Sequence, residues 1–156
     1  MRSEISILFV LVFFLSCAPS RNINDSTKSR GSLDFRSPEV VLDLKDDNTF
    51  AIDQYSQDPD YGYSAEKPVM VGGVAGGPRN ERRFLNALTG PNGEELRYER
   101  LGSCCQFKTR HSPFEDIGLL DRYEVVYVGS RRKMIIYFNM YDSDTLKVPV
   151  GLGLKK

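Results

Sequence analysis

The stretch RNERRFLNALTGPNGEELRYERLGSCCQFKT, Arg79–Thr109, decides the fold of this chain. Its first part spaces apolar residues as in a helix that buries one face, at Phe84, Leu85, Ala87 and Leu88. Gly90-Pro91 is a typical helix end, because neither residue continues a helix well. The alternating run Leu96–Leu101 that follows is typical of a strand. The stretch therefore predicts a helix over Asn80–Thr89 and then a strand.

Downstream lie two longer runs of β-branched and aromatic residues, Tyr123–Val128 and Met134–Tyr141, joined by a short polar segment, and we expect them to form adjacent antiparallel strands. Both faces of the second run are largely apolar, which predicts a central strand. Val40–Leu44 and Thr49–Ile52 flank a four-residue polar turn and predict a first hairpin. The predicted fold class is α+β: a small antiparallel sheet of about five strands, with the one main helix on one face.

The N-terminus has the features of a secretion signal over Met1–Ser16. Arg2 supplies the positive start, and the apolar run Ile5–Leu15 is too short to span a bilayer as a helix. The run ends in Phe14-Leu15-Ser16-Cys17, which resembles the lipobox of bacterial lipoproteins. That resemblance implies cleavage before Cys17 and lipidation of Cys17. The alternative is an ordinary secreted protein in which Cys17 is incidental.

Residues 17–37 are poor in apolar side chains and predict a flexible tether between the lipidated Cys17 and a single small domain over residues 38–156. We therefore expect a protein of the bacterial cell envelope, at the outer membrane, whose membrane partner is reached through the lipid at Cys17.

The charges of the chain balance, with 21 Lys and Arg against 21 Asp and Glu. Removing Met1–Ser16 takes away one cation and one anion, so the mature chain stays neutral. Nucleic-acid-binding proteins usually carry a strong positive charge, so nucleic acid is not an expected partner.

The sequence offers little material for catalysis or metal binding. His111 is the only histidine and stands in a polar segment, where we expect it to be exposed. Cys104, Cys105 and His111 would give three metal ligands, but adjacent cysteines chelate one metal poorly. No catalytic residue, metal or cofactor is predicted.

Cys104 and Cys105 are the most informative pair of residues. Neighbouring Cα atoms are about 3.8 Å apart, below the usual disulfide range, and on a regular strand the two side chains would point to opposite faces. Gly102 just upstream makes a local turn plausible. Three alternatives stay open: a vicinal disulfide, two separately placed thiols in the oxidising envelope, and pairing with another chain.

Several motifs between Tyr61 and Lys147 resemble a family of small bacterial lipoproteins with no established function: YGYSAEKPVMVGG, NERRFLNALTGPNGEEL, RLGSCCQFKT, GLLDRYEV and YFNMYDSDTLK. Members are similar in layout, with a lipobox, a short tether and one small α+β domain. Some carry the name of a 2-dehydro-3-deoxyphosphooctonate aldolase. Such aldolases resemble (β/α)₈ barrels of about 250 residues, whereas residues 17–156 number 140. No aldolase activity is therefore expected.

These observations predict a non-catalytic envelope lipoprotein whose domain binds a partner protein or another envelope component. Two other functions remain as alternatives. One is a small envelope enzyme, and the other is a thiol redox module that uses Cys104 and Cys105.

Overall fold

The computed structural model describes residues 40–72 and 76–156. The predicted signal peptide, the predicted lipidation of Cys17 and the predicted tether over 17–37 lie outside these residues. The described part contains one helix and ten strands, in the order β1 (Leu44–Asp46), β2 (Thr49–Phe50), β3 (Gln54–Tyr55), β4 (Val69–Met70), α1 (Gly77–Ala87), β5 (Leu88–Thr89), β6 (Leu96–Lys108), β7 (Ile117–Tyr127), β8 (Met134–Asn139), β9 (Lys147–Val148) and β10 (Gly153–Leu154).

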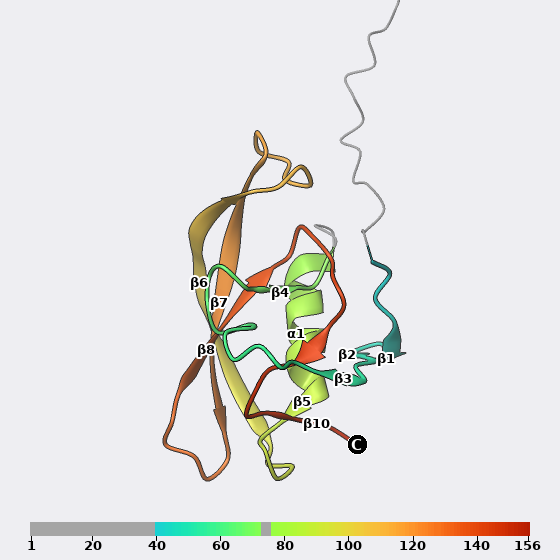
Figure 1. Ribbon diagram of the computed structural model, residues 1–156, viewed down its shortest axis with the longest axis vertical. Coiled ribbons are helices and arrows are strands. Elements are labelled where there is room, and N and C mark those ends of the chain that lie inside the picture. Colours follow the sequence, from blue (N-terminus) through green and yellow to red (C-terminus); the bar gives the residue numbers. More distant parts are fainter. Residues whose placement is uncertain (1–39, 73–75) are drawn as a thin grey trace, which may run out of the picture. The chain divides into compact units, whose positions relative to one another are not determined.

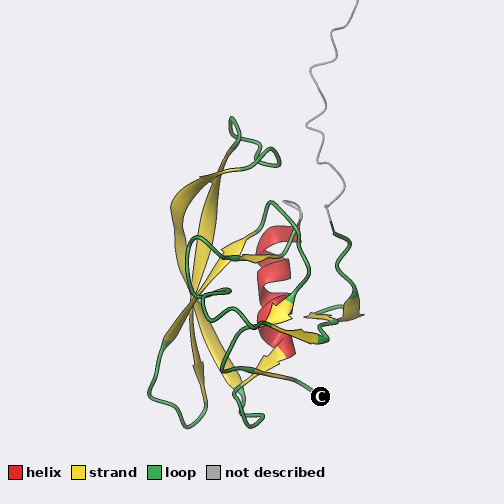
Figure 2. Ribbon diagram, viewed as in Figure 1, coloured by secondary structure: helices red, strands yellow, loops and turns green. Residues whose placement is uncertain are grey.

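The main sheet has four strands in the order β4-β8-β7-β6 (Figure 1). β6 pairs antiparallel with β7, and β7 pairs antiparallel with β8, whereas β4 runs parallel to β8. Three further two-stranded sheets are formed by β1 with β2, β5 with β10, and β3 with β9. The long β6–β7 hairpin extends beyond the end of α1 (Figure 2).

The helix packs its apolar stripe on one face of the main sheet. The ring of Phe84 contacts that of Phe138 edge to face, with centroids 5.7 Å apart, and Tyr123 makes the same kind of contact with Phe138 at 5.4 Å. Phe84, Leu85, Val125 and Phe138 are all fully buried. Residues 84, 85 and 88 share one face of the helix, and residues 123 and 125 share one face of β7. These two faces form this core together.

The α+β class and the single helix within the described residues agree with the sequence. β7 and β8 are adjacent and antiparallel as predicted, with Tyr123 opposite Ile136. The prediction of one antiparallel sheet of about five strands is wrong, because the strands are more numerous, divide into four sheets and include two parallel pairs. Parallel pairing needs a long crossover, and the segment from α1 through β7 provides one between β4 and β8.

The predicted helix bounds also need correction. The helix spans Gly77–Ala87 rather than Asn80–Thr89. Asn80 does not cap it, because its amide nitrogen donates to the carbonyls of Val71 and Gly72 at 3.1 and 2.7 Å. The helix ends early because Leu88 and Thr89 leave it to pair with β10.

We predict that Phe84→Ala lowers the free energy of unfolding by roughly 3–5 kcal/mol, because a fully buried ring leaves a cavity between α1 and the sheet. Urea unfolding followed by circular dichroism measures the change. Phe114→Ala is the matched control, since that ring is 72% exposed, and it should change stability by no more than about 0.5 kcal/mol. Equal effects of the two substitutions would contradict the described core.

Candidate functional site

The vicinal pair Cys104–Cys105 forms a disulfide on β6, with the two Cα atoms 3.8 Å apart. Cys104 lies opposite Leu120 and Gln106 lies opposite Leu119, so Cys105 is an extra residue in the strand. Its backbone turns into the left-handed region, with φ of +49°. A β-bulge of this kind removes the alternation of a regular strand. Both sulfur atoms therefore reach one side of β6, and of the three alternatives the structure contains the first.

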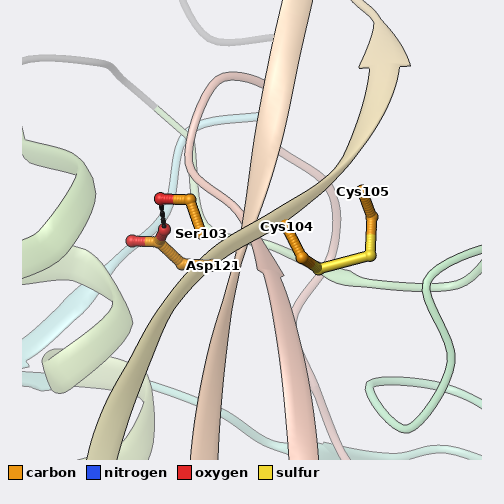
Figure 3. Close-up of a disulfide and its surroundings, with 4 residues drawn as sticks. All are labelled: Ser103, Cys104, Cys105 and Asp121. Atoms are coloured by element: carbon orange, nitrogen blue, oxygen red, sulfur yellow. Dashed lines mark hydrogen bonds between the residues drawn. A yellow bond between two sulfur atoms is a disulfide. The ribbon is translucent and has the colours of Figure 1, made fainter.

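The disulfide lies at the protein surface, with Cys105 exposed and Cys104 half-buried. A second shift in register lies only a few residues earlier on β6, between Arg100 and Gly102. Gly102 has a φ of +103°, which only glycine adopts easily. Two irregularities in succession bend the strand. The disulfide then lies on one side of β6, and the polar groups that contact β7 lie on the other. Figure 3 shows the disulfide on one side of β6, and Ser103 with Asp121 on the other.

An ion pair with a buried carboxylate and a partly exposed guanidinium group occupies that other side. Asp121 on β7 is fully buried, and Arg100 on β6 binds it with two hydrogen bonds, from Nε to Oδ2 at 2.8 Å and from Nη2 to Oδ1 at 2.7 Å. The Ser103 hydroxyl donates to Oδ1 at 2.6 Å. Bidentate Arg–carboxylate pairs are strong and fix geometry. This pair fixes the bulged part of β6 to β7.

A second carboxyl group lies beside the pair. Glu81 on α1 is fully buried, and its Oε2 accepts a hydrogen bond from the Tyr123 hydroxyl at 2.9 Å. Burial, reinforced by the negative charge of Asp121, raises the pKa of Glu81 to about 8. Glu81 is therefore mostly protonated at neutral pH, while Asp121 is compensated by Arg100. Oε1 of Glu81 has no hydrogen-bond partner among the described residues.

His111 belongs to a separate buried cluster at the tip of the β6–β7 hairpin. Its side chain is only 6% exposed, and Nδ1 lies 2.6 Å from Oδ1 of Asp142. Thr109 donates to the same oxygen at 2.6 Å, and Asn139 donates to Oδ2 at 2.7 Å. Burial alone would raise the pKa of Asp142, but these hydrogen bonds together hold it below its usual value.

The predicted exposure of His111 is therefore wrong. Its polar neighbours suggested solvent, but they are partners in a buried network. Asp142 and His111 have the arrangement of two members of a Ser-His-Asp triad, in which a serine hydroxyl would contact Nε2. Nε2 is buried without a hydrogen-bond partner among the described residues. The contacts of Thr109 and His111 with Asp142 fix the hairpin loop to the segment after β8.

Neither Glu81 nor Asp121 was identified as buried from the sequence. Glu81 lies one turn before Phe84 and Leu85 on the same stripe, which is a helical signal for burial. Asp121 alternates with Tyr123 and Val125 on β7, which is the matching strand signal.

Comparison with models of known protein families, with curated protein sequences and with solved structures finds no match. Within residues 40–72 and 76–156, no helix is both long enough and apolar enough to cross a membrane. The same residues contain no group of three or more His, Cys, Asp or Glu side chains placed to hold a metal ion.

We predict that Glu81→Gln changes how stability depends on pH. Unfolded Glu81 loses its proton near its ordinary pKa of 4.5, whereas the folded protein keeps it up to about 8. The folded state thus binds more protons in this window, so the stability from protonated Glu81 is complete below pH 4.5 and is lost as the pH rises through 8. The loss is at most about 1.4 kcal/mol per pH unit.

Chemical unfolding at several pH values between 4 and 9 measures this slope. The wild type should lose stability relative to Glu81→Gln as the pH rises, because glutamine keeps an acceptor for Tyr123 but has no proton to lose. Glu66→Gln, at an exposed position, is the control and should follow the wild type. Parallel curves for the wild type and Glu81→Gln would rule out the buried, protonated carboxyl group.

Proposed function

We propose that this chain is a lipid-anchored protein of the bacterial cell envelope, and that its folded domain binds a partner protein at the free end of the β6–β7 hairpin. The observation that carries the proposal is a change of exposure along one face of β7. Asp121, Tyr123 and Val125 alternate on this face and are buried. Leu119 and Ile117 continue the same face but are 39% and 44% exposed.

Phe114 in the adjoining turn is 72% exposed. The backbone nitrogen of Ile117 donates to the carbonyl of Phe114 at 2.9 Å, so the two residues are held together. We call Phe114, Ile117 and Leu119 the hairpin patch. Single exposed apolar residues are common, but a group of them on one rigid element is typical of a protein–protein interaction site. Leu119 and Ile117 continue the core face of β7 toward the loop end of the β6–β7 hairpin, and that end of the hairpin extends beyond α1 (Figure 1).

The structure fixes the conformation of the turn that carries the patch. Glu115 and Asp116 both have left-handed backbones, with φ of +47° and +59°. Each costs about 1 kcal/mol or more for a residue with a side chain. The hydrogen bonds of Thr109 and His111 to Asp142 hold the loop in this shape. A rigid patch loses little conformational freedom on binding, which favours affinity.

The two carboxylates of the turn favour a protein with basic groups over an anionic lipid surface, and one cation, Lys108, lies opposite Ile117 on β6. Glu115 and Asp116 separate Phe114 from Ile117 in the turn and are exposed. Anionic headgroups would repel these carboxylates. A partner with an apolar contact surface and Lys or Arg at its rim would complement both the side chains and the charges.

The lipid anchor is the other half of the proposal and rests on the Phe14-Leu15-Ser16-Cys17 motif. Lipidation of Cys17 would place the domain at the outer membrane, and residues 18–37 would let it reach a partner a few tens of ångströms away. The resemblance to small envelope lipoproteins supports the same layout.

We predict that a photoreactive benzoylphenylalanine at position 114 gives one discrete crosslinked product in native membranes. The same group at Val128, which is 46% exposed near the β7–β8 turn, is the matched control and should give little product. Gel electrophoresis after irradiation of the full chain measures both. Ile117→Ser with Leu119→Ser should reduce the product from position 114 by at least about tenfold, the effect of losing roughly 1.4 kcal/mol of apolar contact.

Val150→Ser, at an exposed apolar position outside the patch, should leave the yield unchanged. The proposal would be wrong if positions 114 and 128 crosslinked alike, or if the double substitution at 117 and 119 had no effect.

A thiol redox role for Cys104 and Cys105 is a second candidate, favoured by the exposed disulfide. A dithiol partner would attack one sulfur, form a mixed disulfide and then close its own disulfide, leaving Cys104 and Cys105 as two thiols. A crosslinked product that forms without light, is released by dithiothreitol and is absent in Cys104→Ser with Cys105→Ser would favour this candidate in the same experiment.

A further inference from the structure

A second surface feature lies on the outer side of α1. A pocket of about 310 Å³ is lined by Asn48, Arg79, Arg82, Arg83 and Asn86. Arg82 and Arg83 come three and four residues after Arg79, so each neighbours Arg79 on the helix surface. Asn48 comes from the β1–β2 turn, 31 residues before Arg79 in the sequence. The pocket thus gathers three cations and two amides from separate elements.

Neutral oxygen atoms hold two of the three guanidinium groups. The backbone carbonyl of Asp47 accepts from Nη2 of Arg79 at 3.3 Å and from Nε of Arg83 at 3.0 Å. Nη1 of Arg83 donates to Oδ1 of Asn80 at 2.9 Å. Arg82 has no hydrogen-bond or ion-pair partner within the part of the chain that the structure describes. The groups are therefore positioned while donor nitrogens remain for a ligand.

The amides of the pocket are fixed as well. Nδ2 of Asn86 donates to the carbonyl of Asn48 at 3.0 Å. The Tyr98 hydroxyl donates to Oδ1 of Asn86 at 2.7 Å. These bonds connect the pocket to the β1–β2 turn on one side and to β6 on the other, so its wall has a defined shape.

The positive charge of the pocket is not compensated by ion pairs. Among the described residues, no carboxylate lies within ion-pairing distance of Arg79, Arg82 or Arg83, whereas Arg100 and Lys133 each have an acidic partner. The first turn of α1 contains no acidic residue. A helix N-terminus already carries positive partial charge, so cations near it are unfavourable unless an anion is close. The carboxylate of Asp46, on the neighbouring turn, accepts a hydrogen bond from the backbone nitrogen of Asn48 and forms no ion pair with the three arginines.

We propose that this pocket binds a phosphate group. Guanidinium groups form paired, charge-assisted hydrogen bonds that match the geometry of phosphate oxygens, and the two asparagines add neutral hydrogen-bonding groups. The volume lies at the lower end of the range for ligand pockets, which suits a phosphate with a small attached group. That group belongs either to a soluble phosphate or to the headgroup of an anionic phospholipid.

This site goes beyond the proposed function and does not depend on it. It lies on α1 and the β1–β2 turn, whereas the hairpin patch lies on β7 and the loop before it. Loss of crosslinking at position 114 would leave the phosphate site untouched, and loss of phosphate binding would leave the crosslinked product.

Nuclear magnetic resonance of the arginine Nε–Hε groups tests the proposal. Inorganic phosphate is added to the isotopically labelled full chain in a non-ionic detergent. We expect saturable shifts at Arg79, Arg82 and Arg83. Arg82→Gln should weaken binding by about tenfold or more, since it removes charge-assisted hydrogen bonds. It should not disturb the fold, because Arg82 makes no hydrogen bond to the described residues. Arg131→Gln, at an exposed site near the β7–β8 turn, removes the same charge and is the control.

A second arm identifies the source of the phosphate. The same signals are followed in bilayer discs of phosphatidylcholine with and without phosphatidylglycerol. Shifts that need phosphatidylglycerol support a lipid headgroup, and shifts with free phosphate alone support a soluble ligand. The proposal is overturned if neither source gives saturable shifts at the three arginines, or if Arg131→Gln weakens binding as much as Arg82→Gln.

Discussion

Helix α1 lies on the main sheet with a carboxyl group on its buried face, and the packing of the domain depends on how that group is accommodated. Glu81 is fully buried, and the Tyr123 hydroxyl donates to it at 2.9 Å. An ionised carboxylate would be costly there, and burial raises its pKa to about 8. Asp121 nearby keeps Arg100 as its counter-ion, with two short hydrogen bonds. One carboxyl group is thus neutral and the other is paired.

The length of the sheet relative to the helix explains what is left exposed. α1 covers the face of β7 around Tyr123 and Val125, and the aromatic contacts of Phe138 hold the two layers together. Further along β7 the same face is exposed at Leu119 and Ile117. The outer side of the helix carries the opposite character, because Arg79, Arg82 and Arg83 face a pocket. The apolar patch thus lies where β7 extends past the helix, and the cationic pocket lies on the outer side of the helix.

The sequence predicted those features that depend on local periodicity. The apolar stripe of Phe84 and Leu85 indicated the helix, and the run around Tyr123 indicated its strand and the antiparallel neighbour. The buried carboxyl groups were missed because Asp and Glu usually indicate solvent, and only their position on an apolar face shows otherwise. The vicinal disulfide stayed undecided because the bulge at Cys105 depends on how β6 pairs with β7, which local sequence does not determine. The arginine pocket needs the β1–β2 turn, which is distant in the chain.

We propose that a lipid anchor at Cys17 holds the domain at a membrane and that the domain binds a partner protein there. Cys17 precedes the described residues in the sequence, so Cys17→Ala tests the proposed anchor without changing the described fold. The domain keeps its core, its disulfide and both proposed binding surfaces within residues 40–156. Its proposed place in the envelope rests on the lipobox-like motif that ends at Cys17.

The most direct measurement is metabolic labelling of cells with a clickable palmitate analogue, followed by purification of the full chain and of Cys17→Ala. We predict label on the wild type and none on the variant, with the wild type in the membrane fraction. An unlabelled wild type, or equal label on Cys17→Ala, would contradict it.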